Sequence, residues 1–192
     1  MPTRNDAALD FLMTRRSRPA KTLTGPVPDK DTLLTLLTAA ARTPDHGKLE
    51  PWRFIVLEKQ ALLRLSSLVL DRGTALGKDK DMITKAIDQY ANAELAVAVI
   101  SAPKPSEKIP AIEQTYSAGA VCLSLLNAAL AAGWGANWLS GWASHDATFA
   151  REGLGLADHE TIAGFIHIGT ETSAPPERPR PDIDTITTWV AE

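Results

Sequence analysis

The most apolar stretch of the chain reads AGAVCLSLLNAALAA over residues 118–132. It is shorter than the roughly 20 apolar residues that a membrane-spanning helix needs, and Ser124 and Asn127 interrupt it. We therefore predict a buried core helix over residues 112–132. This helix is predicted to end at Gly133, where a cap residue of left-handed conformation is expected.

Predicted helices and strands alternate around this core helix. Apolar residues at helical spacing, preceded by capping residues, predict the other helices, and a continuous apolar run predicts a strand buried on both faces at residues 95–101. Alternation of this kind is typical of a layered α and β protein. The predicted helices run from Asn5 or Asp6 to Arg15, from Asp29 to before Pro44, and over residues 59–72, 79–91 and 146–154; the predicted strands cover residues 53–57, 95–101, 134–140, 162–168 and 186–190.

The length and composition of the chain favour a single domain. Its 192 residues, 44% of them hydrophobic, suffice for one buried core. Residues 172–182 contain four prolines and two arginines, a composition too stiff to fold back as a helix. We therefore expect one domain over residues 1–192 with an extended proline-rich arm at about 172–182.

The charge balance and the cysteine count exclude some classes of partner. With 20 basic and 23 acidic residues the net charge is -3, which gives no bulk attraction to nucleic acid or to an anionic membrane. Cys122 is the single cysteine, so no intramolecular disulfide forms, which fits a reducing compartment. The N-terminus lacks the apolar run and cleavage site of a signal peptide. We expect a cytoplasmic protein with neither nucleic acid nor membrane as a partner.

None of the common catalytic motifs is present in the sequence. There is no nucleophile elbow, P-loop, C-x-x-C pair or zinc-protease motif. The segment from Gly153 to Asp158 begins like a dinucleotide-binding fingerprint but lacks its third glycine. Histidines 46, 145, 159 and 167 have no metal-ligand spacing. We therefore predict neither a catalytic triad nor a metal site, and no classical Rossmann site.

Two groups of residues remain as candidates for ligand binding. Arginines near predicted turns would suit a phosphorylated ligand if they converge, and tryptophans in a glycine-rich segment would line a pocket for a flat ligand. The alternatives are solvated surface arginines and ordinary core or interface tryptophans. The arginines are those at positions 15, 16, 18, 42, 178 and 180, and the tryptophans those at 52, 134, 138, 142 and 189.

Taken in their order along the whole chain, these residues resemble those of the nitroreductase family and, within that family, of its small YdjA-like branch. The resemblance rests on motifs in a fixed order and spacing, each weak when taken alone. They are Arg15-Arg-Ser17, Arg42-Thr-Pro-Asp-His-Gly-Lys-Leu-Glu-Pro-Trp-Arg-Phe-Ile-Val56, Ser117-Ala-Gly119, Gly133-Trp-Gly135, Trp138-Leu-Ser-Gly141 and the proline-rich arm after Ile168-Gly-Thr170.

The resemblance implies an α+β fold with a mostly antiparallel central sheet flanked by helices. It also implies an obligate homodimer with FMN at the subunit interface. NADH or NADPH would reduce FMN and leave, and a small acceptor, namely a nitroaromatic, a quinone or an aldehyde, would then enter the same pocket in a ping-pong cycle. The flavin carries the chemistry, so no catalytic side chain is expected.

Site residues follow from the resemblance motif by motif. Arg15, Arg16 and Ser17 would hold the FMN phosphate, ribityl chain and ring edge from one subunit, and Arg42 and His46 would approach from the other. Trp138, Leu139 and Ser140 would line one face of the flavin ring, and the main chain at Ser140-Gly141 would donate to flavin N5. Arg178 and Arg180 match the basic pair by which some relatives grip the phosphate.

The chain departs from the family pattern at Leu139, where the branch often has an arginine. A charge facing the flavin ring would therefore be missing, which bears on the flavin potential and the choice of acceptor. Leu139 suggests an alternative function, a flavin-binding sensor or storage protein without turnover. A third hypothesis, a structural or nucleic-acid-binding dimer, conflicts with the acidic net charge. Cys122 lies in the predicted core helix, and we expect a core residue rather than a redox thiol.

Overall fold

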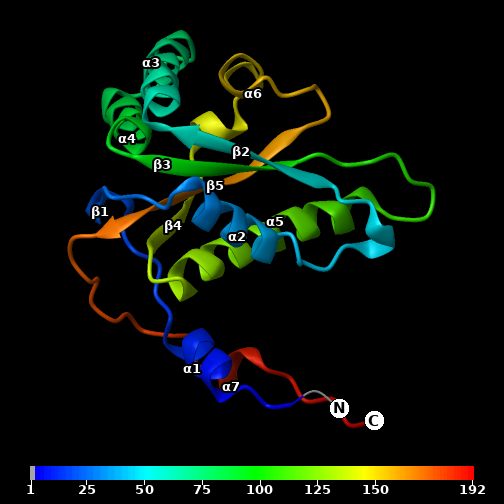
Figure 1. The fold of residues 1–192 in the computed structure, drawn as a ribbon. Helices are drawn as coiled ribbons and strands as arrows, with labels where there is room; N and C mark the ends of the chain where they lie inside the picture. Colours follow the sequence, from blue (N-terminus) through cyan, green and yellow to red (C-terminus); the bar gives the residue numbers. More distant parts are fainter. Residues whose placement is uncertain (1–2) are drawn as a thin grey trace.

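A five-stranded antiparallel sheet separates two layers of helices (Figure 1). The structure is a computed structural model that describes residues 3–192; Met1 and Pro2, part of the predicted domain, lie outside the described residues. The strand order is β1-β5-β3-β2, and β4 also pairs with β5. The strands are β1 (Leu23–Thr24), β2 (Trp52–Glu58), β3 (Leu95–Ser101), β4 (Gly135–Leu139) and β5 (Thr161–Glu171). The predicted fold class, an antiparallel sheet flanked by helices, is confirmed.

The predicted helix starts are confirmed at three capping residues. Asn5, Asp29 and Asp146 each accept a hydrogen bond from a backbone N–H in the first turn of the helix that follows. The helices are α1 (Asp6–Thr14), α2 (Lys30–Ala40), α3 (Lys59–Ala75), α4 (Lys80–Ala91), α5 (Ala111–Ala131), α6 (Ala147–Leu154) and α7 (Ile183–Ile186), with short 3-10 turns at Ala20–Thr22, His46–Lys48 and Trp142–His145.

The apolar stretch over residues 118–132 forms most of α5, which packs with α2 on one face of the sheet. Val121, Cys122 and Leu125 are fully buried there, and burial raises the pKa of the Cys122 thiol to about 12. Gly133 ends the helix with φ of 84°, as predicted. One stripe of α5 is uncovered, since Tyr116 is 67% exposed.

The opposite face of the sheet is covered by α3, α4 and α6 (Figure 1). Tyr90 of α4 and Phe149 of α6 pack there against Phe165 of β5 and against one another. Thus β3, whose residues are all buried, is enclosed between two apolar layers, which explains its continuous apolar run.

The predicted strand over residues 186–190 is wrong. Residues 183–186 form the single turn α7, and residues 187–192 have no regular structure. Trp189 and Val190 are 90% and 81% exposed, and no strand within residues 3–192 pairs with this segment. Conversely, the two-residue strand β1 was not predicted, because it is too short to show a period.

One part of the chain stands apart from the layers. Figure 1 shows α1 and α7 below α5, joined to the rest by extended segments. No residue of α1 is buried, and residues 172–182 contain no helix or strand. Within residues 3–192, no helix combines the length and the apolar character that crossing a membrane would require.

A two-pronged ion pair fixes the edge strand β2 to the turn before β5. Arg53 Nε lies 2.6 Å from Glu160 Oε1, and Arg53 Nη2 lies 2.8 Å from Glu160 Oε2. Hydrogen bonding to Arg53 is the main cause that lowers the pKa of Glu160 to about 2, against the opposing effect of burial. Because this pKa is lower in the folded than in the unfolded chain, the pair stabilises the fold above about pH 4.5 and is lost as the pH falls towards 2.

We expect Glu160→Gln to lower the free energy of unfolding at neutral pH by about 1 to 2 kcal/mol. The value is modest because Arg53 is 41% exposed and water screens the pair. Urea unfolding of both proteins at neutral pH and near pH 3 checks this, since the difference should shrink in acid. An equal difference at both pH values would contradict the assignment.

Candidate functional site

The segment that follows α1 crosses the sheet in close contact with it. Arg18 N donates to Ala136 O of β4 at 2.8 Å, and Asn137 Nδ2 donates to Arg18 O at 2.6 Å. A Cβ on Gly169 of β5 would lie 2.7 Å from Thr24 O, so only glycine permits this approach. The predicted residues Arg15, Arg16 and Ser17 are therefore held at the end of the sheet where β4 begins.

A cavity of about 280 Å³ lies at this end and is called the arginine cavity below. Arg15 Nη2 donates to Ser17 Oγ at 2.9 Å, and Arg16 Nη2 donates to Pro176 O of the arm at 2.8 Å. The Nε atoms of both arginines are buried and have no hydrogen-bond partner among residues 3–192. The residues that line the arginine cavity are Phe11, Thr14, Arg15, Arg16, Arg18, Leu130, Gly133, Trp134, Gly135 and Glu171.

The arginine cavity carries an excess of positive charge. Burial, followed by the nearby charges of Arg180, Arg16 and Arg18, lowers the pKa of Arg15. One acidic group, Glu171, lines the cavity and pairs with Arg18 at 3.2 Å. Buried guanidinium N–H groups without partners in a cationic cavity suit a phosphate, which binds arginine through charge-assisted hydrogen bonds. The residues present therefore fit the phosphate end of FMN.

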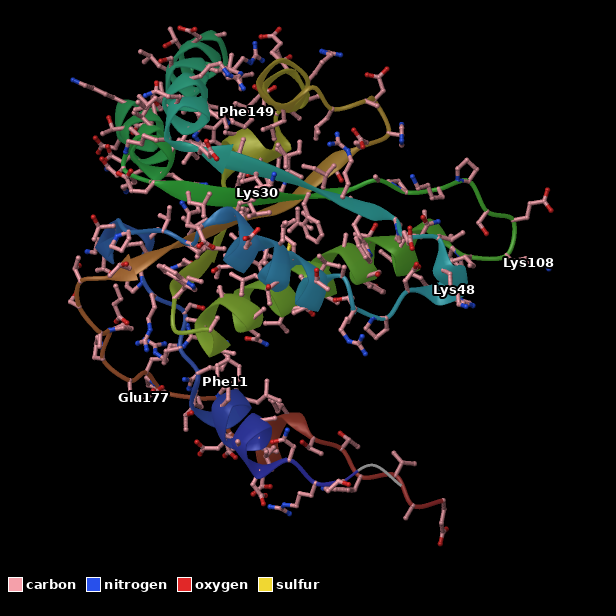
Figure 2. The ribbon with its side chains drawn as sticks, in the orientation of Figure 1. Phe11, Lys30, Lys48, Lys108, Phe149 and Glu177 are labelled. Atoms are coloured by element: carbon pink, nitrogen blue, oxygen red, sulfur yellow. The ribbon has the colours of Figure 1, made fainter. Side chains whose placement is uncertain are left out.

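The two predicted arginines of the arm, Arg178 and Arg180, are not among the residues that line this cavity. Arg180 lies close enough to Arg15 to affect its pKa, and its own guanidinium pairs with Glu177 at 2.8 Å. Arg178 contacts Glu177 through its backbone N–H. Figure 2 shows Phe11 of α1 and Glu177 of the arm at the junction between α1 and the layered part of the molecule.

A second cavity, of about 380 Å³, lies at the other end of β4 and is called the histidine cavity below. Gly135 lines the arginine cavity and Leu139 lines the histidine cavity. The two residues are four positions apart along β4, which separates them by roughly 13 Å. A ligand with a phosphate at one end and a ring at the other fits this layout. The lining residues are Ala20, Lys21, Lys85, Asp88, Gln89, Asn92, Ala93, Leu139 and His167.

The predicted ring-binding segment connects β4 to the next turn. The Trp138 ring lies against Gly164 of β5, where any Cβ would collide with it, and the side chain is 38% exposed. Ser140 and Gly141 are exposed at the end of β4. Trp142 lies elsewhere: it packs against the apolar core that the sheet forms with α3 and α4.

His46 lies at the opposite end of α5 from the arginine cavity, whereas Arg42 directly precedes Thr43, whose Oγ1 lies 2.9 Å from Ser124 Oγ in the second half of α5. His46 Nδ1 is 2.6 Å from Glu113 Oε2, in an open cavity of about 520 Å³, and Arg42 is exposed just after α2. From Glu113 to Leu130, which lines the arginine cavity, α5 rises by about 25 Å. Within one chain the structure therefore does not bring Arg42 and His46 to the other predicted residues.

Most of the histidine cavity could not be predicted from the sequence. Its polar lining comes from the 3-10 turn at Ala20–Thr22, from α4 and from β5, and includes Lys21, Lys85, Gln89 and His167. The one local signal was His167, a lone histidine in the apolar run of β5. Another cavity, of about 690 Å³, lies between α2 and the edge of β2 and contains none of the predicted residues. Among residues 3–192, no group of three or more His, Cys, Asp or Glu side chains is placed to bind a metal ion.

Comparison with known proteins gives matches over most of the chain. Residues 12–170 match the Nitroreductase family. YdjA of Escherichia coli strain K12, provisionally named an NAD(P)H nitroreductase, is 35% identical over 163 residues, which cover 85% of this chain and 87% of YdjA.

Solved structures share the fold. The crystal structure of a nitroreductase-like family protein from Bacillus cereus has a TM-score of 0.80 at 24% identity and covers 99% of this chain and 98% of that one. A protein from Desulfovibrio desulfuricans, provisionally named a nitroreductase and crystallised with FMN, has a TM-score of 0.73 at 19% identity, over 99% and 100% of the two chains.

Proposed function

Because the chain belongs to the nitroreductase family of oxidoreductases, we propose that it uses FMN to carry hydride from NADH or NADPH to a small acceptor. The observation that carries this proposal is the arginine cavity, which is lined by Arg15 and Arg16, whose buried Nε–H groups have no partner in the part of the chain that the structure describes. The name of YdjA and the FMN complex of the Desulfovibrio desulfuricans protein support it. The acceptor classes are nitroaromatics, quinones and aldehydes, used in a ping-pong cycle, and we place the protein in the cytoplasm.

The phosphate end of the site is assigned to Arg15, Arg16 and Ser17, with Arg180 and Arg178 from the arm. Arg15 and Arg16 offer unpartnered N–H groups, and a phosphate would relieve the repulsion that lowers the pKa of Arg15. Because Arg16 also bonds Pro176 O, it would fix the arm over the cavity. We take residues 172–182 as the arm of a single domain.

The ring end is assigned to Trp138, Leu139, Ser140 and Gly141. Bound FMN would supply the hydride chemistry, accepting hydride from the nicotinamide and passing it to the acceptor. The residues of this chain would position the reactants, since hydride transfer needs close approach and no general base. The exposed main chain at Ser140-Gly141 would donate a hydrogen bond to the ring, and no catalytic side chain is proposed.

We propose that the protein is a homodimer with the flavin site at its interface. An amphipathic helix is stable when its apolar stripe is covered, yet Leu9, Leu12 and Met13 of α1 are 48%, 58% and 75% exposed. Trp189 in the C-terminal segment is 90% exposed. Apolar surface gathered in this way on an isolated part of the chain indicates a protein partner, and we assign that partner as a second copy.

A dimer would also resolve the position of Arg42 and His46. His46 is about 25 Å along α5 from the arginine cavity of its own chain, and Arg42 is not among the residues that line that cavity. If two copies of α5 pack antiparallel through the exposed stripe that includes Tyr116 and Leu123, each arginine cavity comes near the partner's copy of this end. The partner's copy of each residue would then complete the flavin site.

The proposed function is tested by adding FMN to the purified protein and following the flavin absorbance. We expect stoichiometric binding, followed by rapid bleaching when NADH or NADPH is mixed in under anaerobic conditions and recovery of colour when an acceptor is added. A protein that takes up no FMN would refute the proposal.

Leu139 favours a second candidate function, a flavin-binding sensor or storage protein. With Leu139 lining the ring end of the site, the charge that many members of the branch place there is absent. Such a protein would bind FMN but would not bleach with NADH or NADPH on the time scale of catalysis. The same rapid-mixing experiment therefore separates the two candidates.

A further inference from the structure

His167 in the middle of β5 is buried without a hydrogen-bond partner. It is 2% exposed, and neither Nδ1 nor Nε2 has a partner in the described part of the chain. Its side chain lines the histidine cavity. An imidazole loses its hydrogen bonds to water on burial, so such a position is costly unless a ligand replaces them.

The surroundings of His167 explain why the chain leaves it unsatisfied. In the sheet it lies opposite Asn137 of β4 on one side and Ala96 of β3 on the other, and Asn137 is engaged with Arg18 O. Burial lowers the pKa of His167 to about 4. The imidazole is therefore neutral at physiological pH, with one nitrogen as donor and the other as acceptor.

A second unsatisfied group faces the same space. Gln89 Nε2 of α4 is buried without a partner, and Gln89 Oε1 lies 3.7 Å from the place that a Cβ on Gly141 would occupy. Gln89 and His167 thus approach the cavity from a helix and a strand, beside the end of the proposed ring-binding segment. The charged side chains that line it are Lys21, Lys85 and Asp88, with Glu94 at a small adjoining cavity that His167 also lines.

We propose that the histidine cavity receives the polar edge of the flavin ring and that His167 hydrogen-bonds this edge from the floor of the cavity. The polar edge of an isoalloxazine alternates carbonyl and ring-nitrogen groups, and a neutral imidazole and an amide each both donate and accept. Lys21 and Lys85 add donors and positive charge where the reduced ring carries negative charge. The inference rests on the proposed function and adds residues that the motifs do not contain.

The test compares two substitutions of His167 with one control. His167→Leu removes both nitrogens but keeps an apolar side chain of similar volume, and His167→Gln keeps a donor and an acceptor. Ile166→Ala is the control, because Ile166 is equally buried on the same strand but lies in the core shared with α5, on the other face of the sheet. The dissociation constants of FMN and of riboflavin, the spectrum of the bound flavin and the melting temperature of the apoprotein are measured for each.

We expect His167→Leu to weaken FMN and riboflavin alike by about tenfold and to shift the visible band of the bound flavin. His167→Gln should restore most of the affinity, and the apoprotein of His167→Leu should melt no lower than the wild type. Ile166→Ala should lower the melting temperature without changing flavin affinity. FMN affinity of His167→Leu within twofold of the wild type would overturn the inference and leave the proposed function standing.

Two further outcomes keep the test decisive. A wild type that binds no flavin overturns both the proposed function and this inference. If His167→Leu does not fold, the wild type with isotope-labelled histidine is titrated with FMN. The ring nitrogen signals of the buried histidine are then expected to shift on binding, and unchanged signals would overturn the inference.

Discussion

Arg15→Ala is expected to weaken FMN binding by about 10- to 150-fold, the equivalent of about 1.5 to 3 kcal/mol for a charge-assisted hydrogen bond. Arg15 lines the arginine cavity, and its buried Nε has no hydrogen-bond partner in the described chain from residue 3 onwards. Burial and three neighbouring arginines lower its pKa, so in the absence of an anion its charge is poorly compensated. The substitution therefore removes a group whose favourable partner would be the phosphate.

Riboflavin, which lacks the phosphate, makes this experiment specific. Arg15→Ala should bind riboflavin as the wild type does, and its affinity for FMN should fall towards that value. Arg15→Lys, which keeps the charge but loses the planar fork of donors, should lie in between. Arg64→Ala is the matched control, because Arg64 of α3 bonds Gly153 O on the other side of the sheet. Equal losses of FMN and riboflavin would show that Arg15 does not contact the phosphate.

Leu12→Glu is expected to convert the protein from a dimer to a monomer. Leu12 lies with Leu9 and Met13 on the apolar stripe of α1, and the three side chains are 58%, 48% and 75% exposed. A carboxylate buried there without a partner costs about 3 kcal/mol, which weakens association on the order of a hundredfold. Size-exclusion chromatography with light scattering measures the result.

The monomer should also lose FMN, because Arg42 and His46 would no longer reach the site from the partner. Leu70→Glu is the control: Leu70 is 48% exposed on α3, and Figure 1 shows α3 on the side of the sheet away from α1. This variant should remain dimeric and retain FMN. A wild type that elutes as a monomer, or a Leu12→Glu variant that stays dimeric, would contradict the assignment of α1 to the interface.

The limits of the sequence show in the C-terminal segment and in α1. Residues 186–190 have the composition of a strand. A strand needs a neighbouring strand to take up its backbone hydrogen bonds, and none within residues 3–192 pairs with this segment. The apolar spacing of α1 correctly predicted a helix but did not reveal that its stripe is left uncovered. Both segments have the apolar pattern of a segment that buries its side chains. That pattern does not tell whether a neighbouring surface is there to cover them.

The elements with local signals could be predicted from the amino-acid sequence alone: the capped starts of α1, α2 and α6, the apolar run of α5 and its end at Gly133, and the Arg15-Arg-Ser17 motif. The contacts across the sheet could be seen in the folded chain alone. There Arg180 of the arm lies near enough to Arg15 to affect its pKa, and His167, Gln89 and Leu139 line one cavity. Periodicity and capping act within a few residues, whereas these contacts depend on the register of β4 and β5 and on the path of the segment that crosses them.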